Sequence, residues 1–530
     1  MKTIAQFPFQ ELNSIPKIVK DFLSGRLGFA QSYTWNPNNI QQKIVEKQQN
    51  YSTAIRNSLA KVVAEQHQNL QLTEAQANNL NALFQENTFT ITTGHQLNLF
   101  SGPVFFIYKI LQVIKSADEL NKQKKGYHFV PIFWMATEDH DFEEINHFKT
   151  TQSRFEIKAK SGTAVGRIPL LDLDFVADFE KEFKGTRFGD ELINLLKFSY
   201  KKGETLAEAT RKLVHSLFAD YGLIIVDGDD QRLKQWMIPC FREELLSQEL
   251  YKNSQAKVDQ LTTSYGKVQV NPREINLFYL KETRNRIVFR DGKYFVLETD
   301  IVFTADEIFI ELEKYPERFS PNALLRPVYQ ESILPNIAYI GGNAEVAYWL
   351  ELTDYFKSIS LCYPILVPRN SMLFISDKQL SKLEGLKLSP NDIFEDEKSI
   401  LSNVLLTNHR LNDLLEEKEE ELNTIFSVLK SNAITTDKSF EQLLQAEETR
   451  QLKSYDRMRK RLLKAEKIKQ TEKVERIKSL FSTLHPNGIW QERQWNFSVF
   501  YADFGKEWIR NCYGIMQIDR SEMIVIAHSF

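Results

Sequence analysis

The fold is decided by TFTITTGHQLNLFSGPVFFIYKILQVIKSADELNKQKKGYHFVPIFWMA, residues 88–136. The stretch begins with a β-branched and aromatic run that breaks at Gly94, which is typical of a strand followed by a loop. Apolar side chains then recur at helical spacing after Pro103. The last ten residues are a nearly continuous apolar run, as in a strand buried on both faces of a parallel sheet. The order strand, loop, helix, strand predicts a βαβ unit.

Two further apolar runs fit the same sheet, YGLIIVDGDD at 221–230 and YPILVPRN at 363–370. Polar or acidic residues follow each run, at the carboxyl edge where open α/β sheets bind ligands. We therefore predict an α/β fold with a Rossmann-like parallel-sheet core. The segments at about 150–220 and 250–320 are less regular, and we interpret them as connecting subdomains inserted into the core.

The texture of the sequence changes from about Val404 to Phe481, where Gly and Pro are absent and Glu, Lys, Leu and Arg dominate. A break at 431–439 separates two helical patterns, which predicts a long antiparallel coiled-coil hairpin. Its charged faces are interpreted as solvated helix surface. The two apolar stripes that we expect to meet are Leu411, Leu415, Leu422, Ile425 and Leu429, and Tyr455, Met458, Leu462 and Ala465.

These patterns predict three domains. Residues 1–380 would form the Rossmann-like core with its inserted segments, and residues 381–510 the helical coiled-coil arm. Residues 511–530 would pack back on the core. A chain of 530 residues is too long for one ordinary core, which agrees with this division.

The composition excludes several classes of protein. The formal net charge is −3, with 67 Lys and Arg against 70 Asp and Glu, so we expect no nucleic-acid partner. The three cysteines lie far apart in sequence and form neither a disulfide framework nor a zinc motif. No run approaches ~18 apolar residues, and the N-terminus lacks the apolar stretch of a signal peptide. We therefore expect a cytoplasmic protein without a membrane segment.

The loop after the first strand carries polar side chains with no partner nearby in sequence. They are His95, Gln96 and Asn98, and they follow Gly94. In a βαβ unit this loop and the end of the next strand meet at one edge of the sheet. The loop is not a G-x-G-x-x-G fingerprint, so it predicts no nicotinamide or flavin cofactor. The alternative is that His95 only caps the following helix.

A dense acidic cluster directly follows the second strand. Glu138, Asp139, His140 and Asp141 would repel one another unless a cation lies among them, such as a metal, a substrate ammonium or a lysine. We predict that His95, Gln96 and Asn98 face this cluster across a crevice. No metal-ligand spacing follows the cluster, so no metal is assigned. The alternative for the acidic residues, above all Glu143 and Glu144, is an ordinary helix N-terminus.

Two further segments supply candidate binding residues. Within 320–352, the Gly pair allows a close backbone approach to a ligand, and the arginine can hold a carboxylate or phosphate. In the segment at 485–500, an aromatic ring beside Arg and Asn could bind a nucleotide, the alternative being a junction with the arm. The candidates for substrate binding are Arg326, Gln330, Asn336, Gly341, Gly342, Glu345, Tyr348 and, at a later strand edge, Arg369; those for cofactor binding are Trp490, Gln491, Arg493 and Asn496.

Taken together, five motifs resemble the bacillithiol biosynthesis cysteine-adding enzymes, the BshC family, in order across nearly the whole chain. They are TGHQLNLFSGPVFFIYKI, VPIFWMATEDHDFEEINH, SPNALLRPVYQESILPNIAYIGGNAEVAYWL, LVPRNS and LLKAEKIK…PNGIWQERQWNF. The resemblance implies a Rossmann-like core related to class I synthetases, a coiled-coil arm and a homodimer. It also implies a ligase that adds L-cysteine to the amine of glucosaminyl malate through an amide bond, giving bacillithiol.

Carried over to this chain, the loop at 94–103 and the cluster at 138–141 correspond to the active crevice. His95 departs from the family motif, where many members have Gln, and a lysine loop ending in K-S-K-S is missing. ATP is expected as the activator, because a free carboxylate and an amine do not condense unaided in water. The expected roles are ammonium binding or deprotonation by Asp139, Asp141 or His140, orientation of the acyl group by Gln96 and Asn98, and malate binding by Arg326.

Two other functions remain open from the residues. One is a metal-dependent hydrolase that uses the acidic cluster at 138–141. The other is a non-catalytic scaffold that dimerises through its coiled coil.

Overall fold

The computed structural model describes residues 1–433 and 438–529. The chain divides into two compact units. The core unit comprises Gln6–Leu373 and Glu492–Ile524, and the arm unit comprises Met1–Ala5, Phe374–Gln491 and Val525–Phe530. Within the described residues, no helix is both long and apolar enough to cross a membrane.

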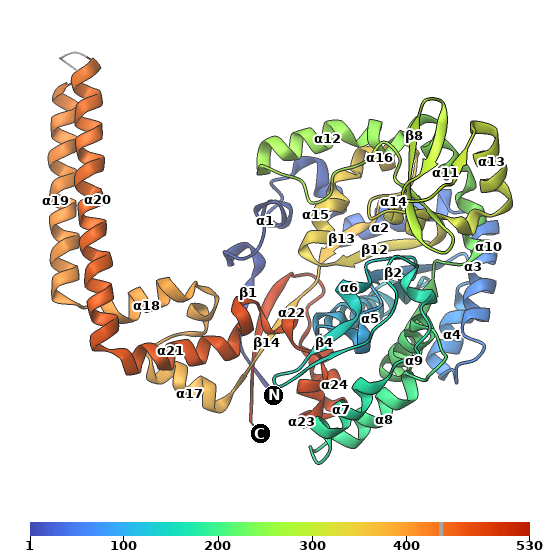
Figure 1. Cartoon of the computed structure of the whole chain (residues 1–530), viewed down its shortest axis with the longest axis horizontal. Helices are drawn as coiled ribbons and strands as arrows, with labels where there is room; N and C mark the ends of the chain where they lie inside the picture. Colours follow the sequence, from blue (N-terminus) through green and yellow to red (C-terminus); the bar gives the residue numbers. More distant parts are fainter. Residues whose placement is uncertain (434–437, 530) are drawn as a thin grey trace. The chain divides into compact units, whose positions relative to one another are not determined.

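A five-stranded parallel sheet forms the centre of the core unit (Figure 1). Its strands lie in the order β13–β12–β2–β3–β6, and every neighbouring pair is parallel. If the five strands are numbered 1 to 5 along the chain and the sheet is read from β6, the order is 3-2-1-4-5, as in a Rossmann fold. The predicted Rossmann-like core is therefore confirmed. The strands are β2 (Thr88–His95), β3 (His128–Met135), β6 (Ile224–Asp227), β12 (Asn336–Gly341) and β13 (Ile365–Pro368).

Helices cover both faces of this sheet, which explains why its strands are apolar on both sides. On one face, α5 (Phe105–Gln123) packs Val113 and Ala117 against Phe89 and Ile91. On the other face, α3 (Thr53–Gln66) contributes to a second and larger cluster with β3 and β6. The predicted βαβ unit is thus present as β2, α5 and β3.

The inserted segments form substructures of their own. The segment between β3 and β6 contains α7 (Asp174–Phe183), α8 (Gly189–Ser199) and α9 (Leu206–Phe218). The segment between β6 and β12 holds an antiparallel sheet in the order β10–β9–β8–β7–β11. Its strands are β7 (Leu277–Leu280), β8 (Arg284–Arg290), β9 (Lys293–Val296), β10 (Val302–Phe303) and β11 (Phe319–Pro321).

Other helices complete the core unit. They are α1 (Lys17–Leu23), α2 (Pro37–Asn50), α4 (Glu74–Ala82), α6 (Phe142–Ile145), α10 (Gln231–Lys234), α11 (Ile238–Ser247), α12 (Glu249–Tyr265), α13 (Ala305–Lys314), α14 (Leu325–Ile333), α15 (Asn343–Glu351), α16 (Thr353–Ser358), α23 (Ser498–Phe504) and α24 (Lys506–Ile515). A third sheet lies in the order β1 (Lys2–Pro8), β15 (Glu522–His528) and β14 (Ser371–Ser376). The chain passes from one unit to the other within each of these strands.

The arm unit contains the predicted antiparallel hairpin, formed by α19 (Arg410–Ala433) and α20 (Lys438–Lys469). Two ion pairs join the helices: Lys430 of α19 pairs with Glu448 of α20, and Arg459 of α20 pairs with Glu419 of α19. The predicted break at 431–439 is narrower than expected, and residues 434–437 lie outside the described residues. Flanking helices are α17 (Asp377–Gly385), α18 (Glu397–Leu406) and α21 (Thr471–Leu484).

The predicted apolar stripes of the hairpin need correction. Phe426 and Leu444 are buried between the helices, and Leu415, Leu422, Tyr455 and Leu462 are half-buried. The rotation of each helix is set by this seam, which turns the other stripe members outward. Those exposed members are Leu411, Ile425, Leu429, Met458 and Ala465.

The units begin and end at other residues than the three predicted domains. The core unit stops at Leu373 and resumes at Glu492. The reason is a buried ion pair, in which both terminal nitrogens of Arg369 donate to the Glu492 carboxylate at 2.9 and 2.7 Å. Helices α23 and α24 then pack in the core unit, a tertiary contact that no local pattern in the sequence indicates.

The Asn336 side chain, which is 0% exposed, ties β12 to β2. Its Oδ1 accepts from the hydroxyls of Thr90 and Thr92 at 3.2 and 2.8 Å, and its Nδ2 donates to Glu331 at 2.7 Å. This residue was expected to bind substrate, and its polar atoms are instead engaged by two threonines of β2 and by Glu331 of α14.

Replacing Asn336 by Leu should therefore lower the free energy of unfolding by about 1–3 kcal/mol, because buried polar groups lose their partner. Urea unfolding of the purified protein measures this change. Asn81→Ala, at an exposed helix position, is the control and should change stability by less than about 0.5 kcal/mol. Equal stabilities of the two variants would contradict the prediction.

Candidate functional site

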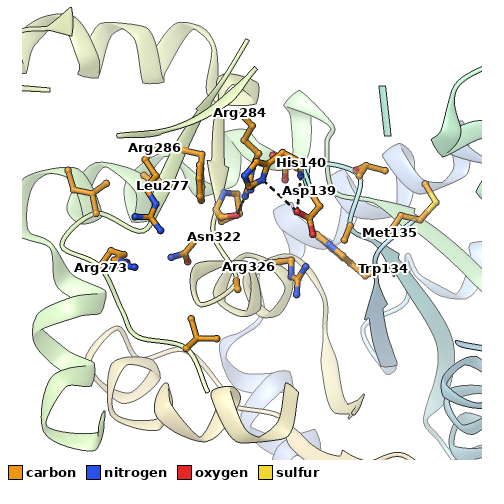
Figure 2. A pocket seen from close by; sticks show the side chains of 18 of the residues that line it. Trp134, Met135, Asp139, His140, Arg273, Leu277, Arg284, Arg286, Asn322 and Arg326 are labelled. Carbon is orange, nitrogen blue, oxygen red and sulfur yellow. Dashed lines mark hydrogen bonds and ion pairs between the residues drawn. The ribbon is translucent and has the colours of Figure 1, made fainter. Parts of the chain in front are cut away.

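A cavity of about 340 Å³ opens at the carboxyl end of β3 in the core unit (Figure 2). Three regions of the chain line it. They are residues 134–140 at the end of β3, residues 270–286 leading into the inserted sheet, and residues 321–326 at the start of α14. The cavity thus lies where the Rossmann sheet meets its second insertion.

The loop after β2 and the end of β3 meet at this edge through Gln96. Its Nε2 donates to Asp139 Oδ2 at 3.0 Å and to Glu144 Oε2 at 2.9 Å. The other carboxylate oxygen of Asp139 accepts from the backbone N–H of His140 at 2.8 Å. The predicted meeting of the two polar segments is therefore found for Gln96, one of its three loop residues.

Asp139 carries a negative charge throughout the neutral range. Burial alone would raise the pKa of this carboxyl, but the hydrogen bonds from His140 and Gln96 and the charge of Arg284 outweigh burial. The pKa of Asp139 is consequently held well below its usual range. A fixed anion at this place attracts a cationic group of a ligand.

Cations from other parts of the chain explain how the acidic cluster is tolerated. Lys234, which is 0% exposed, forms an ion pair with Glu138 and lies 3.6 Å from Asp229. Burial raises the pKa of Glu138, and the charge of Lys234 opposes this rise. Arg284 is buried, and its guanidinium donates to His140 Nδ1 at 2.9 Å.

The contact with Arg284 fixes the state of His140. A guanidinium only donates, so Nδ1 of His140 must accept and the proton of the neutral ring lies on Nε2. Sequence reasoning missed both Lys234 and Arg284. Lys234 follows the strand at 221–230 closely and could have been noticed there, whereas Arg284 lies in an irregular insertion without any motif.

Arginines supply most of the polar surface facing Asp139. Arg273 and Arg286 lie on the side of the cavity opposite Asp139 (Figure 2). Both are exposed, and no described residue forms an ion pair with either. Arg326, which the sequence predicted, also lines the cavity and donates to the Tyr348 hydroxyl at 3.3 Å. Asp139 thus faces several guanidinium groups across one small space, whereas Glu138, which also lines the cavity, is paired with Lys234.

Asp141 lies outside this cavity. It is exposed and precedes the four-residue helix α6, without a side-chain cap to it. Glu143 and Glu144 lie in the first turn of α6, as the helix-terminus alternative expected. The acidic segment therefore divides, with Glu138, Asp139 and His140 lining the cavity and the following acidic residues outside it.

A second polar group occupies the switch point between β2 and β12. Lys109 Nζ donates to the Gly94 carbonyl and to Glu345, both at 2.7 Å. Glu345 also accepts from the Tyr339 hydroxyl and the Gly342 N–H. Burial would raise the pKa of Glu345, but Lys109 and these hydrogen bonds lower it to about 2. Gly94, Gly342 and Glu345 are thus joined by a lysine that the sequence prediction did not name.

His95 points away from the acidic cluster and packs against Phe105 and Phe106, with ring centroids 5.3 and 5.2 Å away. Its Nε2 is buried and has no hydrogen-bond partner among the described residues. Burial lowers the pKa of His95 to about 3, and the charge of Lys109 adds to this effect. The imidazole is therefore neutral at physiological pH.

Several other candidates are held by internal contacts. Asn98 is buried, and its Cβ lies where a side chain at Gly102 would have to be placed; Gly102 also has a φ of +62°. Gln330 donates to Glu331. Gly341 ends β12 and accepts from the Arg369 N–H.

Two of the four residues predicted to bind a nucleotide instead form hydrogen bonds with backbone groups of this chain. Asn496 donates to the carbonyls of Phe100 and Gly102 at 2.7 Å. Gln491, in the arm unit, bonds both the N–H and the carbonyl of Phe374. Arg493 is exposed above Phe105, and Trp490 contacts Phe394.

Binding of a metal ion would require a suitable group of side chains. Among residues 1–433 and 438–529, no three His, Cys, Asp or Glu side chains are grouped so that they could hold a metal ion.

Comparisons with known proteins match the whole chain. Residues 3–370 match the family model "Bacillithiol biosynthesis BshC, N-terminal Rossmann-like domain", and residues 372–528 match the corresponding C-terminal coiled-coil domain. Relatives from Flavobacterium johnsoniae and Christiangramia forsetii are 42% and 41% identical, each over 94% of this chain and 95% of their own. A relative from Bacillus cereus is 27% identical over the same shares. All three carry the name "Putative cysteine ligase BshC".

The state of His95 predicts a pH dependence of stability. In the unfolded chain His titrates near about 6.5, whereas the folded pKa is about 3. Between these values the unfolded state binds the extra proton, so stability is lost as the pH falls below about 6.5. His95→Gln should therefore reduce the loss of unfolding free energy between pH 7 and pH 5 by about 2 kcal/mol. Urea unfolding at both pH values measures it, and identical losses in the two proteins would refute the assignment.

Proposed function

Since the chain belongs to the BshC family of bacillithiol biosynthesis, we propose that it is the ligase that joins L-cysteine to the amine of glucosaminyl malate. ATP is proposed as the reagent that activates the cysteine carboxylate by placing a phosphate-based leaving group on it. The neutral amine then forms the C–N bond at that carbon while the bond to the leaving group breaks, and the nitrogen loses its proton to solvent. The observation that carries the proposal is the cavity in which Asp139 faces Arg273, Arg286 and Arg326.

The charges of this cavity suit the acceptor substrate. Glucosaminyl malate has an amine at one end and two malate carboxylates at the other. Guanidinium groups bind carboxylates through paired hydrogen bonds, and Arg273 and Arg286 have no described partner that would compete. The volume of about 340 Å³ lies within the range of roughly 300–1,000 Å³ that small-molecule sites occupy.

The role proposed for Asp139 is to hold the ammonium group of the acceptor and orient it toward the activated cysteine. A carboxylate with so low a pKa is a weak base, which disfavours Asp139 as the group that removes the proton. His140 is also disfavoured as a base in this arrangement, because Arg284 occupies Nδ1 and Nε2 carries the proton. Gln96 is proposed to keep Asp139 in place.

The rival functions have less support. A metal-dependent hydrolase would need free carboxylates, but Glu138 is paired with Lys234 and Asp139 with Gln96. A pure scaffold would not need arginines without an ion-pair partner, such as Arg273 and Arg286, opposite the half-buried Asp139 carboxylate.

The direct test incubates the purified protein with cysteine, glucosaminyl malate and ATP, and follows bacillithiol by mass spectrometry. We expect product only when all three reagents are present. A parallel reaction with a chelator reports on any metal requirement. A strain lacking this chain should accumulate glucosaminyl malate and contain no bacillithiol, and normal thiol levels there would overturn the proposal.

Asp139→Asn should raise the KM for glucosaminyl malate roughly 10- to 100-fold, because a hydrogen bond to a charged group contributes about 1.5–3 kcal/mol. Asp141→Asn is the matched control, since Asp141 lies outside the cavity and its variant should behave like the wild type. Steady-state kinetics measures both. Equal KM values for the two variants would remove Asp139 from the site.

We also propose that a second copy of this chain covers the outer face of the arm. Leu411, Leu414, Ile425 and Val428 are exposed there, and they form two pairs that lie fourteen residues, or two heptads, apart. Lys418 and Glu421 lie between the two pairs and bond each other at 2.6 Å. An exposed stripe of this period is what a further helix of a coiled coil packs against.

The double variant Ile425→Lys, Val428→Lys should convert such a dimer into monomers, because it places charge on the stripe. Sedimentation velocity measures the molecular mass. Asn423→Lys adds one positive charge at an exposed position of the same helix, away from the stripe, and should leave the dimer intact. A double variant that sediments as a dimer would exclude this face as the interface.

A further inference from the structure

One wall of the cavity is a segment without regular structure, residues 267–276, which we call the strap. It connects α12 to β7, and Val270, Asn271, Arg273 and Ile275 from it line the cavity. Connecting segments of this kind are usually the most mobile parts of a fold. The strap is instead attached to the core at both ends by the buried carboxyl groups of two glutamates.

The first attachment is Glu351, the last residue of α15, which is 1% exposed. Its Oε1 accepts from the backbone N–H groups of Gln269 and Val270 at 3.0 and 3.3 Å. Its Oε2 is buried without a partner among the described residues. Burial raises the pKa of Glu351 to about 8, and the two N–H groups oppose this rise.

The second attachment is Glu244 of α11, which is 0% exposed. Its Oε1 accepts from both the backbone N–H and the Nδ2 of Asn276 at 2.8 Å. The Oδ1 of Asn276 in turn accepts from the Arg273 N–H at 3.1 Å and from Asn322 Nδ2 at 2.8 Å. Asn322 itself lines the cavity, so this chain of bonds runs from a buried acid to the cavity wall.

Neither carboxylate forms an ion pair with a described residue. A buried carboxyl group that faces only N–H donors is costly unless those bonds are kept. Apart from the bond that Glu244 Oε2 accepts from the Leu250 N–H at 3.1 Å, these bonds hold the strap or its ends in place. These hydrogen bonds fix the backbone from which Asn271 and Arg273 line the cavity. The cavity wall is therefore ordered before any ligand binds. Preorganisation of this kind favours affinity, because binding then orders fewer groups.

We propose that the strap is a wall of the acceptor subsite and that Glu351 and Glu244 are positioning residues, which set the affinity for glucosaminyl malate without touching it. This inference rests on the proposed function. It extends that function to two buried acids that lie outside the cavity and that the sequence did not single out.

The test compares Glu351→Leu with Glu351→Gln. The Leu variant removes the acceptor of both N–H groups, whereas Gln keeps one carbonyl oxygen for them. We expect Glu351→Leu to raise the KM and the calorimetric Kd for glucosaminyl malate at least tenfold, with kcat and the KM for cysteine within twofold of wild type. Glu351→Gln should restore most of the affinity. If kcat and both KM values change together, or if Gln is no better than Leu, Glu351 has only a structural role.

Gln76→Leu is the matched control. Gln76 is 0% exposed and donates to the Leu223 carbonyl at 2.8 Å, remote from the cavity-lining segments in sequence. It loses a comparable buried bond to backbone and should leave the KM for glucosaminyl malate unchanged. A KM that rises as much in this variant as in Glu351→Leu would show a general effect of lost stability and overturn the inference.

Hydrogen exchange of the wild type provides a measurement that needs no variant. Glucosaminyl malate should slow amide exchange in peptides covering 267–276, and cysteine alone should not. Binding of glucosaminyl malate without any change in these peptides would overturn the strap inference and leave the proposed function standing. No binding of glucosaminyl malate to the wild type would overturn the proposed function, and with it the role given to the strap.

Discussion

The parallel pairing of β2 with β3 is the constraint on which the rest of the core depends. The two strands are paired without a shift from Thr88 opposite His128 to His95 opposite Met135. Because both strands end at the same level, the residues that follow them emerge side by side. Gln96 reaches Asp139 for this reason, and a shift of one residue would turn every side chain of one strand to the other face.

Features carried by local patterns were predictable, and contacts between distant segments were not. The apolar runs predicted four strands of the sheet, β2, β3, β6 and β13, but not β12, and the absence of Gly and Pro predicted the helical hairpin, because these features depend on the spacing of neighbouring residues. Asp139 and Arg326 were named from their place after a strand and within a motif. Arg284 and Glu351 were not named, because their roles arise only when separate parts of the chain meet.

The prediction for His95 shows that the direction of a side chain could not be predicted either. A polar residue after a strand was expected to face the cluster, but the ring packs between two phenylalanines of the following segment. Sequence gives the position of such a side chain along the chain but not its rotamer. The buried acids of the core differ in the same way, because Glu345 and Glu492 are matched by cations and Glu244 and Glu351 by N–H groups.

The ion pair between Arg369 and Glu492 has a consequence for the architecture of the chain. It joins residues that are distant in sequence, just before the chain leaves the core unit and just as it returns. The intervening residues are therefore an insertion whose two ends start from one place. Such an insertion can lengthen or shorten by whole heptads during evolution without altering the connectivity of the sheet. The connectivity of the parallel sheet therefore does not depend on the length of the hairpin.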